Sequence, residues 1–193
     1  MARGSPAAIA DPAARSRRTL KTLLFADVAG YSRLQDGFVP LFQDRFWRLA
    51  AREIAASATK PLLTNSWGDA LYAVFPSPAD GAEFALRLLH GFETEDWAAA
   101  GLAGVRGVRI ALHAGPVFCG FDPIIGRDNY FGSSVTRAAR IEPVTPPGTV
   151  YASEAFAALL AASGEAACAT DYIGRLTLAK GYGEARLYRL RRA

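Results

Sequence analysis

The distribution of hydrophobic and polar positions along the chain predicts an alternation of strands and helices. Residues 21–28 end in a nearly continuous apolar run, which is typical of a strand buried on both faces. Apolar residues recur at three-to-four spacing within 33–57 and 79–92, and this period predicts two helices. Two apolar runs within 61–75 flank a Gly-Asp turn, so we expect a hairpin there.

The second half of the chain continues the alternation. A strand pair is predicted at 108–113 and 117–119, hinged at a Gly-Pro pair, and a polar loop is predicted at 121–129. The other predicted elements are helices at 131–142 and 154–162, and strands near 150–152, 172–178 and 186–190. This order predicts a single α/β (α+β) domain, a sandwich built on a ferredoxin-like βαββαβ core.

Composition and charge narrow the class of protein. Residues 1–19 are rich in Ala, Pro, Arg and Ser without periodicity, so we expect a flexible leader before a domain at 20–193. The chain is 51% hydrophobic, and no apolar run approaches the roughly 20 residues of a membrane span, which favours a cytoplasmic protein. The net charge of +4 suits an anionic partner such as a nucleoside triphosphate. The basic residues near the N-terminus have no interleaved aromatics, so no nucleic-acid partner is expected.

Candidate chemistry begins where the first predicted strand ends. Asp27 is followed by the turn Gly30-Tyr31-Ser32, whose backbone N–H groups and hydroxyl can be aimed at an anion. A carboxylate beside such a turn suits a divalent cation on a polyphosphate, because Mg²⁺ prefers one or two carboxylates plus phosphate oxygens. A lone Asp at a strand end is also typical of a helix cap or a turn. A second carboxylate in the hairpin turn, Asp69, favours the cation site.

Five motifs, in order along the chain, resemble the catalytic domain of class III nucleotidyl cyclases. They are Phe25-Ala26-Asp27, Gly68-Asp69, Arg109 to Gly115, Phe131 to Glu142, and Leu178 to Gly181. The chain looks most similar to the pyrimidine (uridylate) cyclases of bacterial antiphage signalling systems. The resemblance implies conversion of a nucleoside triphosphate to its 3′,5′-cyclic monophosphate and pyrophosphate. It also implies a head-to-tail homodimer with active sites at the subunit interface.

The resemblance implies roles for the residues that match. Asp27, Asp69 and the Val28 carbonyl would hold two divalent ions, Mn²⁺ or Mg²⁺, and the Gly30–Ser32 turn would cradle phosphates. One ion would lower the pKa of the ribose 3′-hydroxyl, and the other would neutralise the triphosphate.

Other expected contacts come from the second subunit, and here the chain departs from the family pattern. Arg140 would stabilise charge growing on the α-phosphate, and Lys180 would bind the triphosphate. Solvated surface side chains are the alternative for both. Thr136 stands where the family usually has an asparagine that orients the ribose, and Pro116 stands where some members have a phosphate-binding arginine. Neither departure changes Asp27 or Asp69, the residues expected to hold the metal ions.

The base-reading positions match neither purine pattern. Adenylate cyclases of the family pair a lysine with an aspartate here, and guanylate cyclases begin with a glutamate, but this chain has Asn65 and Asn129. An amide both donates and accepts, which matches the edge of uracil. Trp67 replaces a smaller aliphatic residue and favours a small base, although core or interface packing is the alternative. UTP is therefore the favoured substrate, and cyclic UMP would activate a separate effector.

Other functions remain open. The chain could be an adenylate or guanylate cyclase, or a catalytically inactive cyclase fold that senses nucleotides. Retention of both Asp27 and Asp69 favours an enzyme. A diguanylate cyclase of the related fold is not favoured, because its acidic signature hairpin is absent.

Overall fold

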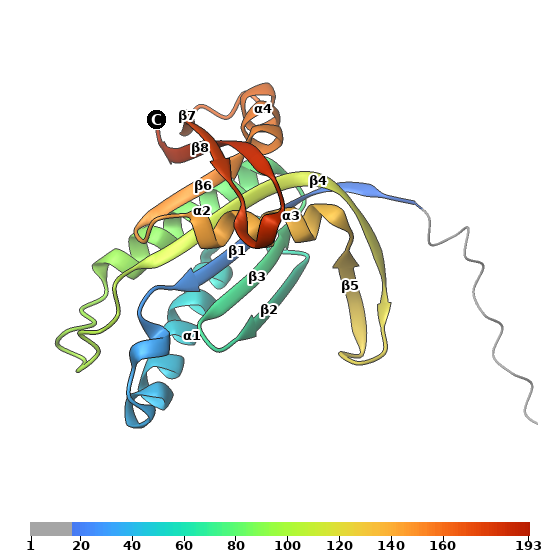
Figure 1. Cartoon of the computed structure of the whole chain (residues 1–193). Helices are drawn as coiled ribbons and strands as arrows, with labels where there is room; N and C mark the ends of the chain where they lie inside the picture. Colours follow the sequence, from blue (N-terminus) through green and yellow to red (C-terminus); the bar gives the residue numbers. More distant parts are fainter. Residues whose placement is uncertain (1–16) are drawn as a thin grey trace, which may run out of the picture.

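The protein is built around one twisted sheet, which a computed structural model describes for residues 17–193 (Figure 1). Most of the leader expected at 1–19 lies outside the described residues, and the first strand already begins at Thr19. The strand order is β2-β3-β1-β4-β6-β8-β7, and β5 pairs with β4 beyond this path. The strands are β1 (Thr19–Val28), β2 (Leu63–Trp67), β3 (Ala70–Phe75), β4 (Val108–Asp122), β5 (Arg127–Phe131), β6 (Thr149–Ser153), β7 (Cys168–Thr177) and β8 (Glu184–Arg192).

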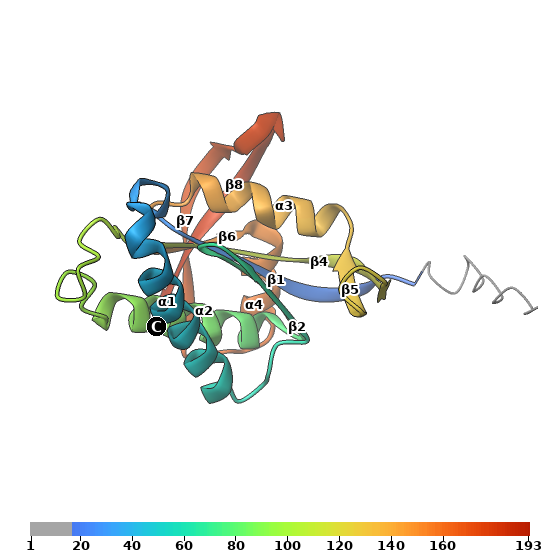
Figure 2. The same ribbon diagram turned by 90° about the horizontal axis from the view of Figure 1, so that it is seen from below.

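Helices cover both faces of the sheet unequally. They are α1 (Val39–Ala56), α2 (Pro78–Thr94), α3 (Ser133–Ile141) and α4 (Glu154–Ala162). Figure 2 shows α1, α2 and α4 on one face and α3 on the other. The larger core cluster lies under α1, α2 and α4, and a smaller cluster, which includes Leu23, Tyr72 and Ala138, lies under α3. The result is a single mixed α+β domain, as the sequence predicts. None of the helices in 17–193 is both long and apolar enough to cross a membrane.

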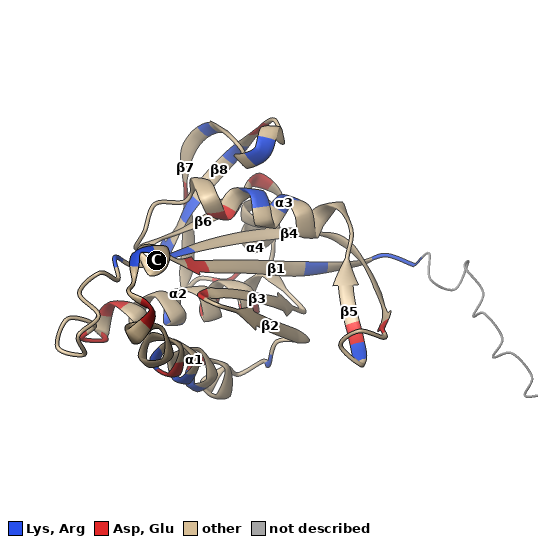
Figure 3. Cartoon of the chain, turned by 60° about the horizontal axis from the view of Figure 1, so that its bottom comes forward, with Lys and Arg blue, Asp and Glu red and all other residues tan. Residues whose placement is uncertain are grey.

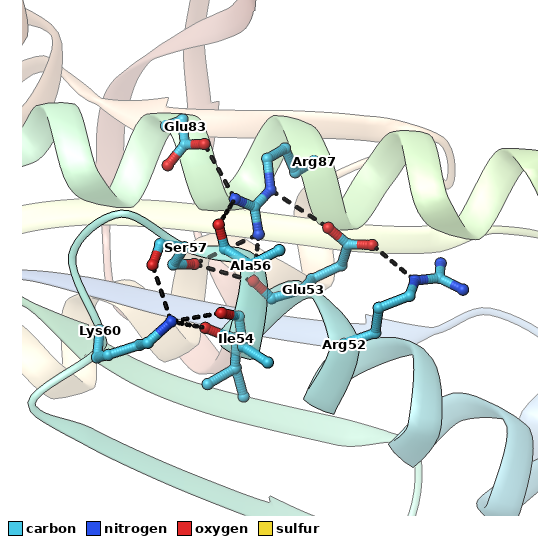
Figure 4. A network of polar contacts seen from close by, with 9 residues as sticks. Arg52, Glu53, Ile54, Ala56, Ser57, Lys60, Glu83 and Arg87 are labelled. Carbon is cyan, nitrogen blue, oxygen red and sulfur yellow. Dashed lines mark hydrogen bonds and ion pairs between the residues drawn. The ribbon is translucent and has the colours of Figure 1, made fainter.

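A polar network fixes α1 against α2 and so positions the start of β2 (Figure 4). Arg87 of α2 donates to the Glu53 carboxylate at 3.2 Å and to the Ala56 carbonyl at 2.9 Å. Lys60 donates to the Ser57 carbonyl at 2.9 Å. These side chains satisfy carbonyl groups that the end of α1 leaves without helical partners. The chain therefore leaves α1 on a fixed path into the hairpin.

Three predicted boundaries are corrected. The helix expected at 33–57 begins only at Val39, after two short 3₁₀ turns, because a proline fits the first turn of a helix but not its interior. The strands expected at 108–113 and 117–119 are one strand, β4. β4 continues through Pro116, which lies opposite Leu20 of β1, whereas β6 pairs only with 109–112.

The loop expected at 121–129 is also wrong, because it contains the end of β4 and the start of β5. The two strands form a projecting hairpin, in which Phe118 lies opposite Phe131 and Asp122 lies opposite Arg127. We call residues 118–131 the arm. Most of its residues beyond Gly120 are exposed or only half-buried, so their polarity reflects a solvated strand pair rather than an irregular loop.

Candidate active site

The two predicted metal-binding carboxylates line the same cavity. Asp27 is the penultimate residue of β1, and Asp69 lies in the turn between β2 and β3. β1 and β3 pair antiparallel up to Ala26 and Leu71, which sets the hairpin turn beside the end of β1. A cavity of about 470 Å³ is lined by both carboxylates, Val28 and the Gly30–Ser32 turn. Figure 3 shows acidic colour where β1 ends.

The turn after β1 needs a glycine. Gly30 has φ of +100°, and a Cβ atom there would lie 2.2 Å from the Gly104 carbonyl oxygen. The Ala29 N–H donates to the Gly107 carbonyl at 2.9 Å, and the Ala29 carbonyl accepts from the Arg106 N–H at 2.8 Å. These two hydrogen bonds tie the turn to the segment before β4. Tyr31 packs its ring 5.1 Å from Phe42. The tyrosine therefore anchors the turn and leaves backbone groups and Ser32 to face the cavity.

Arg109 and Glu142 extend the carboxylate pair into a charged cluster. Arg109 of β4 is the direct cross-strand partner of Asp27 and forms an ion pair with its carboxylate. The same guanidinium lies 2.9 Å from Glu142, which follows α3. All three side chains are at least 70% buried, with exposures of 27%, 23% and 15% for Arg109, Asp27 and Glu142. The cluster therefore joins β1, β4 and the end of α3 at the cavity.

The pKa values of two carboxyl groups in the cluster are raised. Burial and, after it, the nearby charge of Asp27 raise the pKa of Asp69 to about 6. Burial also raises the pKa of Glu142 to about 7, although Arg109 opposes the shift. Arg109 pairs with Asp27 and Glu142, whereas Asp69 forms no ion pair with it. This excess of negative charge suits a bound cation.

The oxygen donors of the cavity fit a divalent ion that takes its remaining ligands from substrate or water. Within residues 17–193 no group of three or more His, Cys, Asp or Glu side chains gathers at one metal position. Asp27 and Asp69 alone would leave an ion with open positions, which is how Mg²⁺ binds in phosphate-transfer sites. The Val28 carbonyl is a third available oxygen from the cavity lining.

The sequence motifs contain Arg109 and Glu142, but sequence reasoning gives neither a role. A signal was present, since Arg109 stands in an otherwise apolar strand segment, Val108 to Leu112. A charged side chain in a buried strand needs a buried partner of opposite charge. The partner of Arg109 can be identified as Asp27 only when the strand pairing is known.

The predicted residues of the second subunit lie away from the cavity. Ser134, Ala138 and Ile141 face the sheet from α3, whereas Thr136 is exposed and lies on the outer side of the helix. Arg140 follows Thr136 by one helical turn and shares that side. Lys180 is exposed in the loop between β7 and β8, with a left-handed φ of 58°. Within one chain, none of the three lines the cavity of Asp27 and Asp69.

The predicted base-reading residues occupy different surroundings. Asn65 lies opposite Tyr72 on the sheet face that α3 covers, and Trp67 is 57% exposed two residues further along β2. Asn129 of the arm donates to Asp122 at 3.0 Å and accepts from the Tyr130 N–H at 2.8 Å. The amide of Asn129 is therefore engaged within the arm. Asn65 is half-buried and its side-chain oxygen accepts a hydrogen bond from Arg127 of the arm, whereas Trp67 is exposed near the hairpin turn.

Solved structures of other proteins share this fold. A guanylate cyclase domain from Catenaria anguillulae in complex with GTP is 19% identical, covers 90% of this chain and 96% of its own, and superposes with a TM-score of 0.73. An adenylate cyclase from Trypanosoma brucei is 20% identical over 89% of each chain, with a TM-score of 0.75. The adenylyl cyclase CyaB from P. aeruginosa is 14% identical and covers 92% and 96%, with a TM-score of 0.74.

The family follows from the sequence match itself. The model of the adenylate and guanylate cyclase catalytic domain matches residues 52–192, and the chain belongs to this family. The class III nucleotidyl cyclase domain expected from the sequence motifs is thereby confirmed. Among curated proteins no match was found. The closer similarity to pyrimidine cyclases stays a prediction.

Proposed function

We propose that this protein is an active nucleotide cyclase that converts UTP to 3′,5′-cyclic UMP and pyrophosphate. The observation that carries the proposal is the convergence of Asp27 and Asp69 on one cavity beside the Gly30–Ser32 turn. A cavity of about 470 Å³ is within the usual size of a small-molecule site. Since nucleoside triphosphates are cytoplasmic metabolites, the proposal implies a cytoplasmic enzyme.

The chain's own residues supply binding, orientation and charge. Arg109 holds the Asp27 carboxylate from the neighbouring strand, which fixes one oxygen and leaves the other for a ligand. Arg106 also lines the cavity and supplies positive charge for a phosphate. Divalent ions bound by Asp27 and Asp69 would neutralise the triphosphate and lower the pKa of the ribose 3′-hydroxyl. The Gly30–Ser32 turn would hold phosphate oxygens through its N–H groups, in line with the attacking oxygen.

A homodimer would complete the site. Thr136, Arg140 and Lys180 do not line the cavity of their own chain, so we assign them to a site formed with another copy. The arm offers an apolar surface for such a copy, since Phe121 is 64% and Ile124 is 92% exposed. Arg140 would then stabilise charge on the α-phosphate of the partner's substrate, and Lys180 would bind its triphosphate.

Two features favour a pyrimidine. The accessible Trp67 takes up space beside the hairpin turn, which disfavours a purine, and Asn65 offers an amide in place of a charged side chain. Asn129 would contact the base only if it gave up its hydrogen bonds to Asp122 and to the Tyr130 N–H. The product would serve as a second messenger that a separate effector reads, in keeping with the antiphage systems that the chain resembles.

The proposal is tested by incubating the purified protein with each of the four ribonucleoside triphosphates and Mn²⁺. We expect cyclic UMP as the main product, and no product from Asp27→Asn or Asp69→Asn. Asp171→Asn is the matched control, because Asp171 is an exposed aspartate paired with Arg191 on β8. Cyclic product from any other nucleotide at a higher rate would refute the UTP preference. No cyclic product at all would refute the activity.

A nucleotide-sensing module without activity is the second candidate. Thr136 in place of the usual asparagine is the feature that favours it, because a hydroxyl lacks the reach of an amide. The same assay separates the two, since a sensing module binds a nucleoside triphosphate and releases no pyrophosphate. Retention of both cavity carboxylates favours the enzyme.

A further inference from the structure

A second charged cavity lies between α3, the β7–β8 pair and the start of α4. Its volume is about 410 Å³. Three arginines from three elements line it, namely Arg137 of α3, Arg175 of β7 and Arg186 of β8. Figure 3 shows blue segments on α3 and on the β7–β8 pair. No residue lines both this cavity and the one that holds Asp27 and Asp69, so the two are separate.

The charges of this cavity leave one arginine without a carboxylate partner. Arg186 lies 2.9 Å from Glu154 and Arg175 lies 3.8 Å from Glu184, and all four side chains are more than half exposed. Exposed ion pairs of this kind contribute little to stability, so these arginines can turn to another anion. Arg137 forms no ion pair among the described residues. The three arginines therefore outnumber the two glutamates of the lining.

The buried side of the cavity holds a hydrogen-bond donor without an acceptor. His113 and Ser153 line the cavity and are only 6% and 5% exposed, and the His113 Nδ1 lies 2.7 Å from the Ser153 hydroxyl. If the hydroxyl donates to Nδ1, the ring proton is on Nε2, and if Nδ1 donates to the hydroxyl, the hydroxyl hydrogen is free. In either tautomer one donor of this pair has no acceptor among the described residues. An unmatched buried donor costs free energy until an acceptor binds.

The start of α4 adds further donors to the same cavity. Ser153 caps the helix by accepting from the Phe156 N–H at 3.2 Å. The N–H groups of Glu154 and Ala155, in the first turn, have no partner within the helix, and both residues line the cavity. The N-terminus of a helix also carries partial positive charge. Arginine side chains, a buried donor and backbone N–H groups thus converge from four elements.

We propose that this cavity binds a phosphate group, either free inorganic phosphate or the phosphate of a small ester. A phosphate has enough oxygens to accept hydrogen bonds from Arg137, from an arginine of the β7–β8 pair and from the buried donor at once, whereas a carboxylate has only two. The planar guanidinium fork also suits phosphate oxygens.

A phosphate bound there would join α3 to the β7–β8 pair. α3 carries Thr136 and Arg140, and the loop between β7 and β8 carries Lys180. None of these three residues lines the second cavity, but all three lie on the elements that the phosphate would join. The bound anion would therefore hold the residues assigned to the partner's site in one arrangement. This consequence rests on the proposed function, whereas the binding of phosphate does not.

Nuclear magnetic resonance of the histidine rings tests the site directly, because the chain has only two histidines, His90 and His113. The variant His90→Gln assigns their signals. We expect the His113 signals to shift in a saturable way when inorganic phosphate or glycerol 3-phosphate is added without divalent ions and at constant ionic strength. Tighter binding of the ester would identify an esterified ligand, and tighter binding of phosphate would identify the free anion. Acetate should bind at least about tenfold more weakly than phosphate.

Variants of the exposed arginine separate binding from a general effect of charge. Arg137→Met should weaken phosphate binding at least about tenfold, because it removes a charged donor and keeps the apolar stem, and Arg137→Lys should restore part of it. Arg48→Met, which removes an exposed arginine paired with Asp44 on α1, should bind phosphate like wild type. Amide hydrogen exchange in α3 should slow when phosphate is added to wild-type protein, but not when it is added to Arg137→Met.

The inference is overturned if the His113 signals show no saturable shift, if acetate binds as tightly as phosphate, or if Arg137→Met binds phosphate like wild type. Unchanged exchange in α3 of the phosphate-bound wild-type protein would overturn the proposed link to the β7–β8 pair. None of these measurements needs turnover. Cyclic product without phosphate binding at this cavity would leave the proposed activity standing, whereas phosphate binding without any cyclic product would refute the activity alone.

Discussion

His113 makes the stability of the fold depend on pH in a defined window. It lies in β4, is only 6% exposed, and its Nδ1 is 2.7 Å from the Ser153 hydroxyl. That hydroxyl also caps α4 by accepting from the Phe156 N–H at 3.2 Å. Burial and, after it, the positive charge of Arg137 lower the pKa of His113 to about 4. The charged groups that line the cavity beside it are Arg137, Glu154, Arg175, Glu184 and Arg186.

The size and the sign of the effect follow from the two pKa values. The unfolded chain takes up a proton at His113 below about pH 6.5, whereas the folded protein does so only near 4. Between these values the unfolded state binds more protons, so the free energy of unfolding falls as the pH falls. At about 1.4 kcal/mol for each pH unit, the full loss is about 3 kcal/mol, of which about 2 kcal/mol is reached at pH 5.

Urea unfolding of wild-type protein and His113→Asn at about pH 7.5 and about pH 5 measures this contribution. Asparagine keeps a polar atom near the position of Nδ1 and does not titrate. We expect the variant to be less stable at the higher pH, since it loses packing volume. On going to the lower pH, the difference in the free energy of unfolding between the two proteins should shift by about 2 kcal/mol in favour of the variant. Equal pH dependence in the two proteins would refute the reasoning. Ser163→Ala, at the end of α4, is a control that should lose stability equally at both pH values.

Three further predictions concern the site. Trp67→Ala and Asn65→Lys should each shift the ranking of the four nucleoside triphosphates, measured as initial rates of cyclic product, and an unchanged ranking in both would contradict the base-pocket assignment. Gly30→Ala should lower the free energy of unfolding by more than about 1 kcal/mol, because the new Cβ meets a backbone oxygen at 2.2 Å, and a urea midpoint like that of wild type would contradict this. Mixing inactive Arg140→Ala with inactive Asp27→Asn should restore about a quarter of wild-type turnover, because half of the dimers would be hybrids with one intact site. No recovery on mixing would contradict shared sites.

The sequence predicts the parts of the fold in which periodicity reflects burial. Residues 154–162 were expected as a helix and form α4, and the hairpin turn falls at Gly68 as expected. β5 was missed because both faces of the arm meet water, so its strand has no alternating pattern. Pro116 suggests a break, and only the strand pairing shows that β4 continues through it beside β1.

The candidate site was predicted in part. The sequence gives Asp27 and Asp69 as carboxylates in turns, but only strand pairing brings them to one cavity. The role of Arg109 depends on the carboxylate that it meets across the sheet, and the contact of Arg127 with Asn65 likewise joins two strands. Such partners lie far apart in the sequence, and no local pattern identifies them.

The central claim is that Asp27 and Asp69 together hold a cation, and Mn²⁺ binding tests it most directly. Electron paramagnetic resonance of Mn²⁺, titrated with the protein and α,β-methylene UTP, measures the affinity without turnover. We expect wild-type protein and Asp171→Asn to bind alike, and Asp27→Asn and Asp69→Asn each to bind at least about tenfold more weakly. Wild-type affinity for Mn²⁺ in either cavity variant would contradict the claim.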